Sequence, residues 1–218
     1  SYTPHVSEGI NTAARNEFLC IREGATDLVQ PQSAFIHGVA LLPVDIAEMA
    51  ADGTSLIWSP RTNVTLYGDT ARVSLYHNLG VRIGLGTDWI ATGSMNMLRE
   101  LQCADYLNAN HIHADDDGTP FFNDEELWLM ATRNSAEVLG VDDRVGIIAE
   151  GLVADIVIFD GATGVDHRAV IDAEPSDVVL VLRPEGNSAA YPLYGDAEVV
   201  SALPGGDSCD ALDVCGLS

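Results

Sequence analysis

Short apolar runs that end in polar residues recur along the first part of the chain, and this recurrence restricts the fold more than any other feature. The runs end near residues 5, 37, 60 and 88. A spacing of about 25–30 residues is the size of a βα unit. Between the runs, 44–51 and 70–79 carry apolar residues at helical spacing, and each is followed by a glycine of the kind that ends a helix. The sequence therefore predicts an α/β fold with parallel strands.

The rest of the chain divides into a helical part and a part with short strands. Two further helices are expected at 95–108 and 124–139. After residue 146 the helical period disappears, and apolar stretches between turn residues indicate strands at 154–160, 178–182 and 198–200. The expected domains are an α/β domain at 1–145, an accessory β segment at 146–203 and a tail at 204–218.

The charge of the chain is strongly negative. It contains 21 Asp, 12 Glu, 10 Arg and no Lys, which gives a formal net charge of −23. Such a field repels phosphate groups and anionic lipid surfaces, so neither nucleic acid nor a membrane is expected as a partner. No apolar run reaches the roughly 18–20 residues that a membrane span needs. We expect a soluble protein, with the cytoplasm as the favoured compartment.

The four cysteines fall into two groups. Cys20 and Cys103 lie in apolar, helix-like stretches and are expected to be small buried side chains with free thiols. Cys209 and Cys215 flank five residues in the tail, a spacing that allows a small disulfide loop. A bond between these two would indicate export, because disulfides persist in oxidising compartments. The sequence leaves both states of this pair open.

Polar side chains stand where the predicted strands end. His5, His37 and Asp88 each follow such a strand, and in a βα barrel the carboxyl ends of the strands are where catalytic and metal-binding groups collect. Two imidazoles and a carboxylate suit Zn²⁺, or another divalent ion such as Fe²⁺, with one position left for water. Glu8 lies three residues after His5, close enough to exchange a proton with that water.

Each of these signals also has a purely structural interpretation. A histidine after a strand is more often a hydrogen-bonded loop residue than a ligand, and Ser7 with Glu8 also fits a helix entrance. The joint placement with Asp88 is what favours a metal site. His111 and His113 lie in an acidic loop after the last predicted strand, so we interpret them as part of a solvated turn.

Five separated motifs resemble, in order and spacing, the amidohydrolase superfamily, and in particular its branch of guanine deaminase, cytosine deaminase, atrazine chlorohydrolase and imidazolonepropionase. The motifs are Pro-His-Val-Ser-Glu at 4–8, Ile-His-Gly at 36–38, Trp-Ser-Pro-Arg-Thr-Asn at 58–63, Gly-Leu-Gly-Thr-Asp at 84–88 and Gly-Leu-Val-Ala-Asp-Ile-Val at 151–157. The resemblance implies a TIM-type (β/α)8 barrel, of which this chain holds strands five to eight, followed by part of a small β-sandwich domain.

The resemblance also implies a role for single residues. His5 matches the metal-binding histidine of the fifth strand, and Glu8 matches the glutamate that shuttles protons. His37 matches the sixth-strand histidine, which contacts the water or the substrate. Asp88 matches the eighth-strand aspartate, which binds the metal and takes a proton from the water. Asn63 matches a position near the substrate.

The sequence departs from the family pattern at its start. The family begins with a β segment and a His-x-His pair on the first strand, and no such pair precedes His5 here. Four strands of an eight-stranded barrel would leave two edges and an apolar inner layer exposed. We therefore expect a covering partner, which is the N-terminal half in a longer natural protein, a separate chain or a second copy of this chain.

These features favour a metal-dependent hydrolase that uses activated water to break a carbon–nitrogen, non-peptide bond in a small cyclic amide, amidine or heteroaromatic substrate. The alternative is a non-catalytic α/β binding or assembly module that keeps the site residues as remnants. A Rossmann-type nucleotide site is disfavoured, because Gly84 and Gly86 lack the third glycine of its motif.

Overall fold

The computed structural model describes residues 1–162, 164–184, 190–204, 206 and 209–211. The chain forms two compact units, Ser1–Ile147 and Ile148–Ser218. Every residue of the first unit is described. Within the described part of the chain, each helix is too short or too polar to cross a lipid bilayer.

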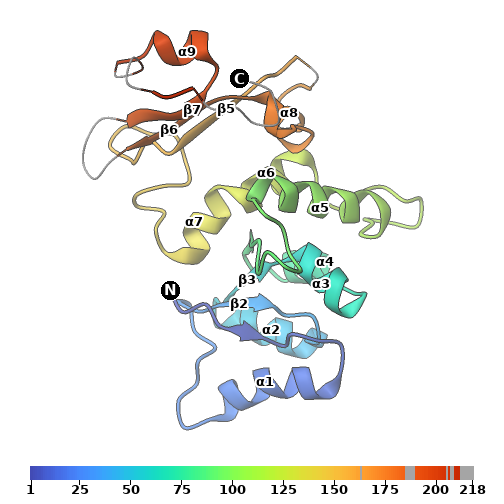
Figure 1. Cartoon of the computed structure of the whole chain (residues 1–218). Helices are drawn as coiled ribbons and strands as arrows, with labels where there is room; N and C mark the ends of the chain where they lie inside the picture. Colours follow the sequence, from blue (N-terminus) through green and yellow to red (C-terminus); the bar gives the residue numbers. More distant parts are fainter. Residues whose placement is uncertain (163, 185–189, 205, 207–208, 212–218) are drawn as a thin grey trace. The chain divides into compact units, whose positions relative to one another are not determined.

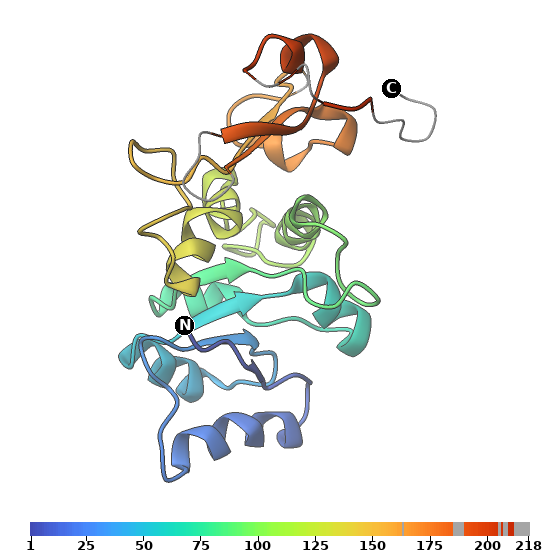
Figure 2. The same cartoon turned by 60° about the vertical axis from the view of Figure 1, so that its left-hand side comes forward.

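The first unit is built on a parallel sheet of four strands in chain order. These strands are β1 (His5–Val6), β2 (Ala34–His37), β3 (Ser55–Trp58) and β4 (Ile83–Leu85). In Figure 2 the arrows of this sheet, coloured from blue to green, run in one direction. Each neighbouring pair is parallel, with registers such as Ile36 opposite His5 and Leu85 opposite Trp58. The predicted α/β fold with parallel strands is confirmed.

Helices connect the strands and continue after the last one. They are α1 (Thr12–Glu23), α2 (Pro43–Ala51), α3 (Pro60–Tyr67), α4 (Val73–Asn78), α5 (Met97–Asn110), α6 (Asp124–Ala131) and α7 (Arg133–Leu139), labelled in Figure 1. Side-chain caps begin several of them: Asn11 accepts from the backbone of Ala14, and Asn123 forms a capping box with Glu126. Gly68 ends α3 in the left-handed conformation.

Some predicted helices differ from those observed. The single helix expected at 124–139 is two helices, because Thr132 leaves the helical conformation with φ −124° and ψ −99°, and its hydroxyl donates to the carbonyl of Trp128. The helix expected at 70–79 begins only at Val73. Helix α3 was not predicted, although Pro60 at its first turn and Gly68 after its last are start and stop signals.

The core of the first unit lies between the sheet and its helices. All four residues of β3 are buried, as expected for a parallel strand covered on both faces. Phe18 from α1 packs edge-to-face on Phe35 from β2, with ring centroids 6.1 Å apart. The Arg15 guanidinium binds both carboxylate oxygens of buried Asp45, at 2.6 and 2.8 Å, and so ties α1 to α2.

The two cysteines of the first unit are less buried than expected. Helix α1 buries Ala14 and Phe18, which lie four residues apart on one face. Cys20 lies about 200° around the helix from Phe18 at 100° per residue, and its side chain is exposed. The prediction of a buried Cys20 was therefore wrong. Cys103 on α5 is half-buried, and burial raises the pKa of its thiol.

The second unit contains an antiparallel sheet in the order β5, β6, β7. Its described elements are β5 (Ile156–Phe159), α8 (Arg168–Ile171), a 3₁₀ turn (Pro175–Asp177), β6 (Val178–Pro184), β7 (Ala190–Gly195) and α9 (Ala197–Ser201). The prediction of a strand at 198–200 was wrong, because this segment lies in α9. Asp196 still bonds the carbonyl of Val179 at the end of the ladder, and the chain then turns so that Val200 is buried on one helix face. The predicted Cys209–Cys215 pair involves Cys215, which lies outside the described residues.

Gly38, the residue after β2, is expected to tolerate substitution by alanine poorly. Its φ is +58°, and an added Cβ would lie 2.5 Å from the Tyr76 hydroxyl oxygen and 2.9 Å from a methyl of Leu56. Gly68 has a similar φ of +66°, but an added Cβ there would have no atom within 4 Å. A substitution at Gly68 therefore measures the backbone strain without a steric clash. We expect Gly68→Ala to lower the free energy of unfolding by about 1 kcal/mol and Gly38→Ala by about 2–4 kcal/mol, measured by urea unfolding. An equal loss in both variants would contradict the close packing of Tyr76.

Candidate active site

Three side chains that the sequence singles out converge at the carboxyl ends of the strands in the first unit. His5 lies on β1, His37 ends β2 and Asp88 follows β4. One potential ligand atom from each lies within 4.8 Å of the others. Asp88 Oδ1 is 3.8 Å from His5 Nε2, and Asp88 Oδ2 is 3.9 Å from His37 Nε2. Two nitrogens and a carboxylate oxygen at this separation could hold a divalent metal ion.

The backbone is strained at the same three strand ends. In the first unit, the non-glycine residues with positive φ are Ser7 at 54°, His37 at 77° and Asp88 at 53°. Each such residue costs on the order of 1–3 kcal/mol and persists only where the surrounding structure holds it. At His37 and Asp88, the positive φ turns the chain sharply at the same residue whose side chain joins the cluster. The strained backbone and the cluster of potential ligands thus coincide at the strand ends.

His37 is fully buried and has one ring nitrogen without a hydrogen-bond partner. Its Nδ1 lies 2.9 Å from Asn63 Oδ1. Since an amide oxygen only accepts, the ring donates from Nδ1 and a neutral ring keeps its lone pair on Nε2. That Nε2 lies 3.6 Å from Glu8 Oε2 and faces the cluster. A buried polar atom with no partner is unfavourable, so Nε2 is suited to a ligand, a substrate or a water molecule.

Asn63 is held by a hydrogen-bond chain through Thr70 and in turn orients His37. Trp58 Nε1 donates to Thr70 Oγ1 at 2.7 Å, and Asn63 Nδ2 donates to the same oxygen at 3.3 Å. The amide nitrogen is therefore turned to Thr70 and the amide oxygen to His37. Asn63 is itself fully buried. Its predicted contact with a substrate stays a prediction, since the structure places its amide against a histidine and a threonine.

Glu8 lies beside the three potential ligands. Its Oε2 is 3.3 Å from His5 Nδ1, and its Oε1 accepts a hydrogen bond from the Tyr67 hydroxyl at 3.0 Å. Glu17 on α1 holds the turn that carries Glu8, because its carboxylate accepts from the backbone nitrogens of Ser7, at 2.8 Å, and of Glu8, at 3.4 Å. The carboxylate of Glu8 is thus placed next to the cluster and stays partly open to solvent.

A buried glutamate connects the loop after Asp88 to α3 and α5. Glu100 Oε1 accepts from the Arg61 backbone nitrogen at 3.0 Å, and the Arg61 side chain donates to Ser94 Oγ at 2.8 Å. Burial raises the pKa of Glu100, against the lowering effect of its hydrogen bonds. The network attaches the loop between Asp88 and α5 to the start of α3.

Sequence reasoning missed Tyr67, Glu17 and Glu100. Only Glu100 had a signal in the sequence: it shares the buried stripe of α5 with Leu101, Ala104 and Leu107, where a charge is unexpected. Tyr67 and Glu17 act through contacts between segments distant along the chain, which leave no local pattern.

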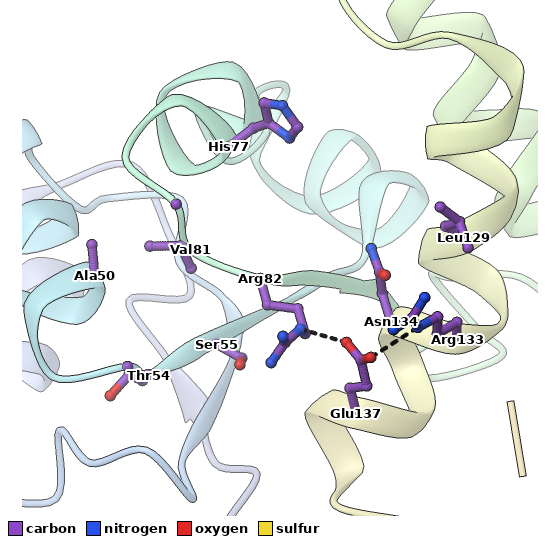
Figure 3. Close-up of a pocket in the computed structure, with 12 residues that line it drawn as sticks. Ala50, Thr54, Ser55, His77, Val81, Arg82, Leu129, Arg133, Asn134 and Glu137 are labelled. Atoms are coloured by element: carbon purple, nitrogen blue, oxygen red, sulfur yellow. Dashed lines mark hydrogen bonds and ion pairs between the residues drawn. The ribbon is translucent and has the colours of Figure 1, made fainter. Parts of the chain in front are cut away.

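A cavity lies at the opposite ends of the strands. It has a volume of about 480 Å³ and is bordered by Ser55 at the start of β3, Arg82 just before β4, and Arg133 and Glu137 from α7. Figure 3 shows the Glu137 carboxylate between the two arginines, with ion pairs of 2.7 Å to Arg82 and 2.9 Å to Arg133. The histidine cluster is not part of its lining. Because chemistry in barrel folds lies at the carboxyl ends of the strands, the cluster is the better candidate site.

The comparison with known protein families identifies the family. A sequence model of the amidohydrolase family matches residues 6–188. The chain belongs to the amidohydrolase family. The family predicted from the five motifs is thus confirmed.

Among curated relatives, a 5-methylthioadenosine/S-adenosylhomocysteine deaminase of Thermococcus onnurineus is 36% identical over 126 residues, which are 57% of this chain and 28% of that protein. The enzyme of the same name from Desulforudis audaxviator is 34% identical over 125 residues, 56% of this chain and 28% of that protein.

Solved structures show the same fold. An adenosine deaminase from Xanthomonas campestris with bound zinc superposes with a TM-score of 0.69 at 21% identity, over 83% of this chain and 43% of that one. Atrazine chlorohydrolase from Arthrobacter aurescens in complex with zinc gives a TM-score of 0.68 at 24% identity, over 92% of this chain and 47% of that one. This chain spans under half of those structures and 28% of the curated relatives above.

Proposed function

We propose that this chain supplies half of the catalytic site of a metal-dependent hydrolase. The enzyme would break a carbon–nitrogen, non-peptide bond in a small cyclic amide, amidine or heteroaromatic molecule by means of activated water. The observation that carries the proposal is the convergence of His5, His37 and Asp88 within 4.8 Å, with the Glu8 carboxylate beside them. A structural role alone would not require two strained strand ends and an unpartnered, buried imidazole nitrogen at one point.

The finer architecture follows from the same proposal. Strands β1 to β4 would be strands five to eight of a (β/α)8 barrel, and the antiparallel sheet of the second unit would be part of a β-sandwich domain. The parallel order of the four strands and the likeness to the two zinc-containing structures support this assignment. The open edges of β1 and β4 would be covered by an N-terminal half, by a separate chain or by a second copy.

Zinc is the metal we propose, with Fe²⁺ as the alternative. The donor set fits, because His5 offers an imidazole nitrogen and Asp88 a carboxylate oxygen, and the imidazole of His37 is a potential third donor beside them. The buried Nε2 of His37, which lacks a hydrogen-bond partner, would be satisfied by the ion or by a water molecule or substrate beside it. A bound zinc ion would supply water activation, by lowering the pKa of water from about 15.7 to about 7.

The protein side chains would handle the substrate and the protons. Asp88 would accept a proton from the attacking water, through a carboxylate that is only 8% exposed. Glu8 would pass the proton that the water releases on to the leaving nitrogen through Oε2, the oxygen that faces the two histidines. His37 would orient the substrate with Nε2, while Asn63 fixes the tautomer of its ring.

Among substrates, aminated heteroaromatic rings are the first class to test. The support is the similarity to proteins named as deaminases of 5-methylthioadenosine and S-adenosylhomocysteine. The strongly acidic chain, with a net charge of −23, also favours neutral or cationic rings over phosphorylated ones.

Metal analysis tests the proposal directly. With the complementary half present, we expect about one zinc ion per barrel after dialysis, together with ammonia release from 5-methylthioadenosine or a related amine. This chain alone should hold zinc weakly, because three donors in an open half-site leave the coordination incomplete. The measurement is elemental analysis beside an ammonia assay. A completed protein without metal and without turnover would instead support a non-catalytic binding or assembly module.

A further inference from the structure

Tyr67 is the residue outside the converging cluster that makes the most direct contact with Glu8. It is the last residue of α3, and its hydroxyl lies 3.0 Å from Glu8 Oε1, 59 positions away along the chain. The carboxylate can only accept, so the phenol donates. Burial, together with the hydrogen bond and charge of Glu8, raises the pKa of Tyr67 to about 12. The hydroxyl therefore keeps its proton at neutral pH and remains a donor.

This contact divides the two oxygens of Glu8 between different tasks. Oε1 is occupied by Tyr67, while Oε2 lies 3.3 Å from His5 Nδ1 and 3.6 Å from His37 Nε2. A glutamate side chain without such a contact has several rotamers of similar energy, and ordering it costs up to about 2 kcal/mol. A neutral donor on Oε1 selects the rotamer in which Oε2 faces the two histidines, where it can take part in proton transfer.

Helix α3 serves two residues of the site from one face. Asn63 and Tyr67 are four residues apart, so their side chains lie one above the other on the helix. Asn63 bonds His37, and one turn later Tyr67 bonds Glu8. Gly68 then ends the helix in a left-handed conformation with φ +66°. A single helix thus sets the orientation of both the histidine and the glutamate.

We propose that Tyr67 is a positioning residue for Glu8, whose hydroxyl holds Oε1 so that Oε2 is the oxygen that carries the proton. This inference rests on the proposed hydrolase function. It also explains why a tyrosine stands at the exposed end of a short helix, with its hydroxyl turned toward the candidate site.

The first test is kinetic and uses the completed enzyme with 5-methylthioadenosine as the probe. Tyr67→Phe keeps the ring and removes only the donor, so we expect kcat to fall about 10-fold while KM and zinc content stay unchanged. Tyr106→Phe is the matched control, because Tyr106 lies exposed on α5 and should leave all three values unchanged. A Tyr67→Phe enzyme with the kcat of the unmodified protein would overturn the positioning role, as would a change in KM alone.

The second test needs no turnover. In a double-mutant cycle of Tyr67→Phe and Glu8→Ala, the shifts in melting temperature should be non-additive, because each variant removes the same hydrogen bond. Additive shifts would overturn the proposal. Failure of the proposed function is distinguishable: the completed protein would then bind no metal and show no turnover, while the melting cycle would still report the contact.

Discussion

Glu8→Gln is expected to abolish turnover and to leave zinc bound. Glu8 stands beside the three potential ligands, with Oε2 at 3.3 Å from His5 Nδ1 and 3.6 Å from His37 Nε2. Glutamine has the same shape and can still accept from Tyr67 with its amide oxygen, but it cannot carry a proton. General acid–base catalysis by one side chain is worth about 10²–10⁴-fold, so kcat should fall by that factor. The measurement is kcat beside zinc content by elemental analysis.

The control for this substitution is Glu125→Gln. Glu125 is exposed in the first turn of α6 and is not one of the clustered residues, so its variant should keep the original kcat. Wild-type turnover in Glu8→Gln would show that another group moves the proton. A loss of zinc together with turnover would show instead that Glu8 belongs to the metal ligands.

Asp88→Asn is expected to lower both zinc affinity and turnover. The Asp88 side chain is only 8% exposed and approaches both histidines, so its charge is the group that would balance a cation there. Its φ is 53°, a conformation that asparagine tolerates better than most residues. The substitution therefore removes the charge with little added backbone strain. We expect kcat to fall at least about 100-fold, since the proton acceptor is lost.

Comparison with Asp88→Ala separates charge from backbone. Alanine in the left-handed region is strained by about 1–2 kcal/mol, so Asp88→Ala should also lower the melting temperature, whereas Asp88→Asn should change it less. Asp115→Asn, in an exposed loop, is the control for loss of one negative charge. An Asp88→Asn enzyme with full zinc occupancy and full turnover would contradict the role of this carboxylate in the site.

Much of the fold and the centre of the candidate site could be predicted because they depend on local periodicity. A buried strand is a short apolar run, and parallel strands bring their carboxyl ends to the same edge of the sheet. The residues that follow three such runs, His5, His37 and Asp88, were therefore expected at the same edge of the sheet, and the parallel order β1 to β4 places them there. The same pattern failed at 198–200, where two valines were interpreted as a strand and the segment is helix α9.

The contacts around this centre could not be predicted. The exposure of Cys20 depends on which face of α1 meets the core, and the break at Thr132 accompanies a hydrogen bond from its hydroxyl to the Trp128 carbonyl. A short apolar run specifies neither. Glu17 reaches the turn at Ser7 from α1, and Tyr67 reaches Glu8 from α3. Such pairs join segments far apart along the chain, so no local spacing indicates them.

The amino-acid sequence by itself determined the parallel α/β order, the family and the residues at the strand ends, because hydrophobic periodicity and short motifs act over a few neighbouring residues. Only the tertiary structure decided which nitrogen of His37 faces the cluster and which oxygen of Glu8 faces the two histidines. Those orientations are set by Asn63 and Tyr67, through hydrogen bonds of 2.9 and 3.0 Å that exist only after α3 has packed beside the strands. Hydrogen bonds depend on the distance and direction between two groups in space, and the order of the residues along the chain specifies neither.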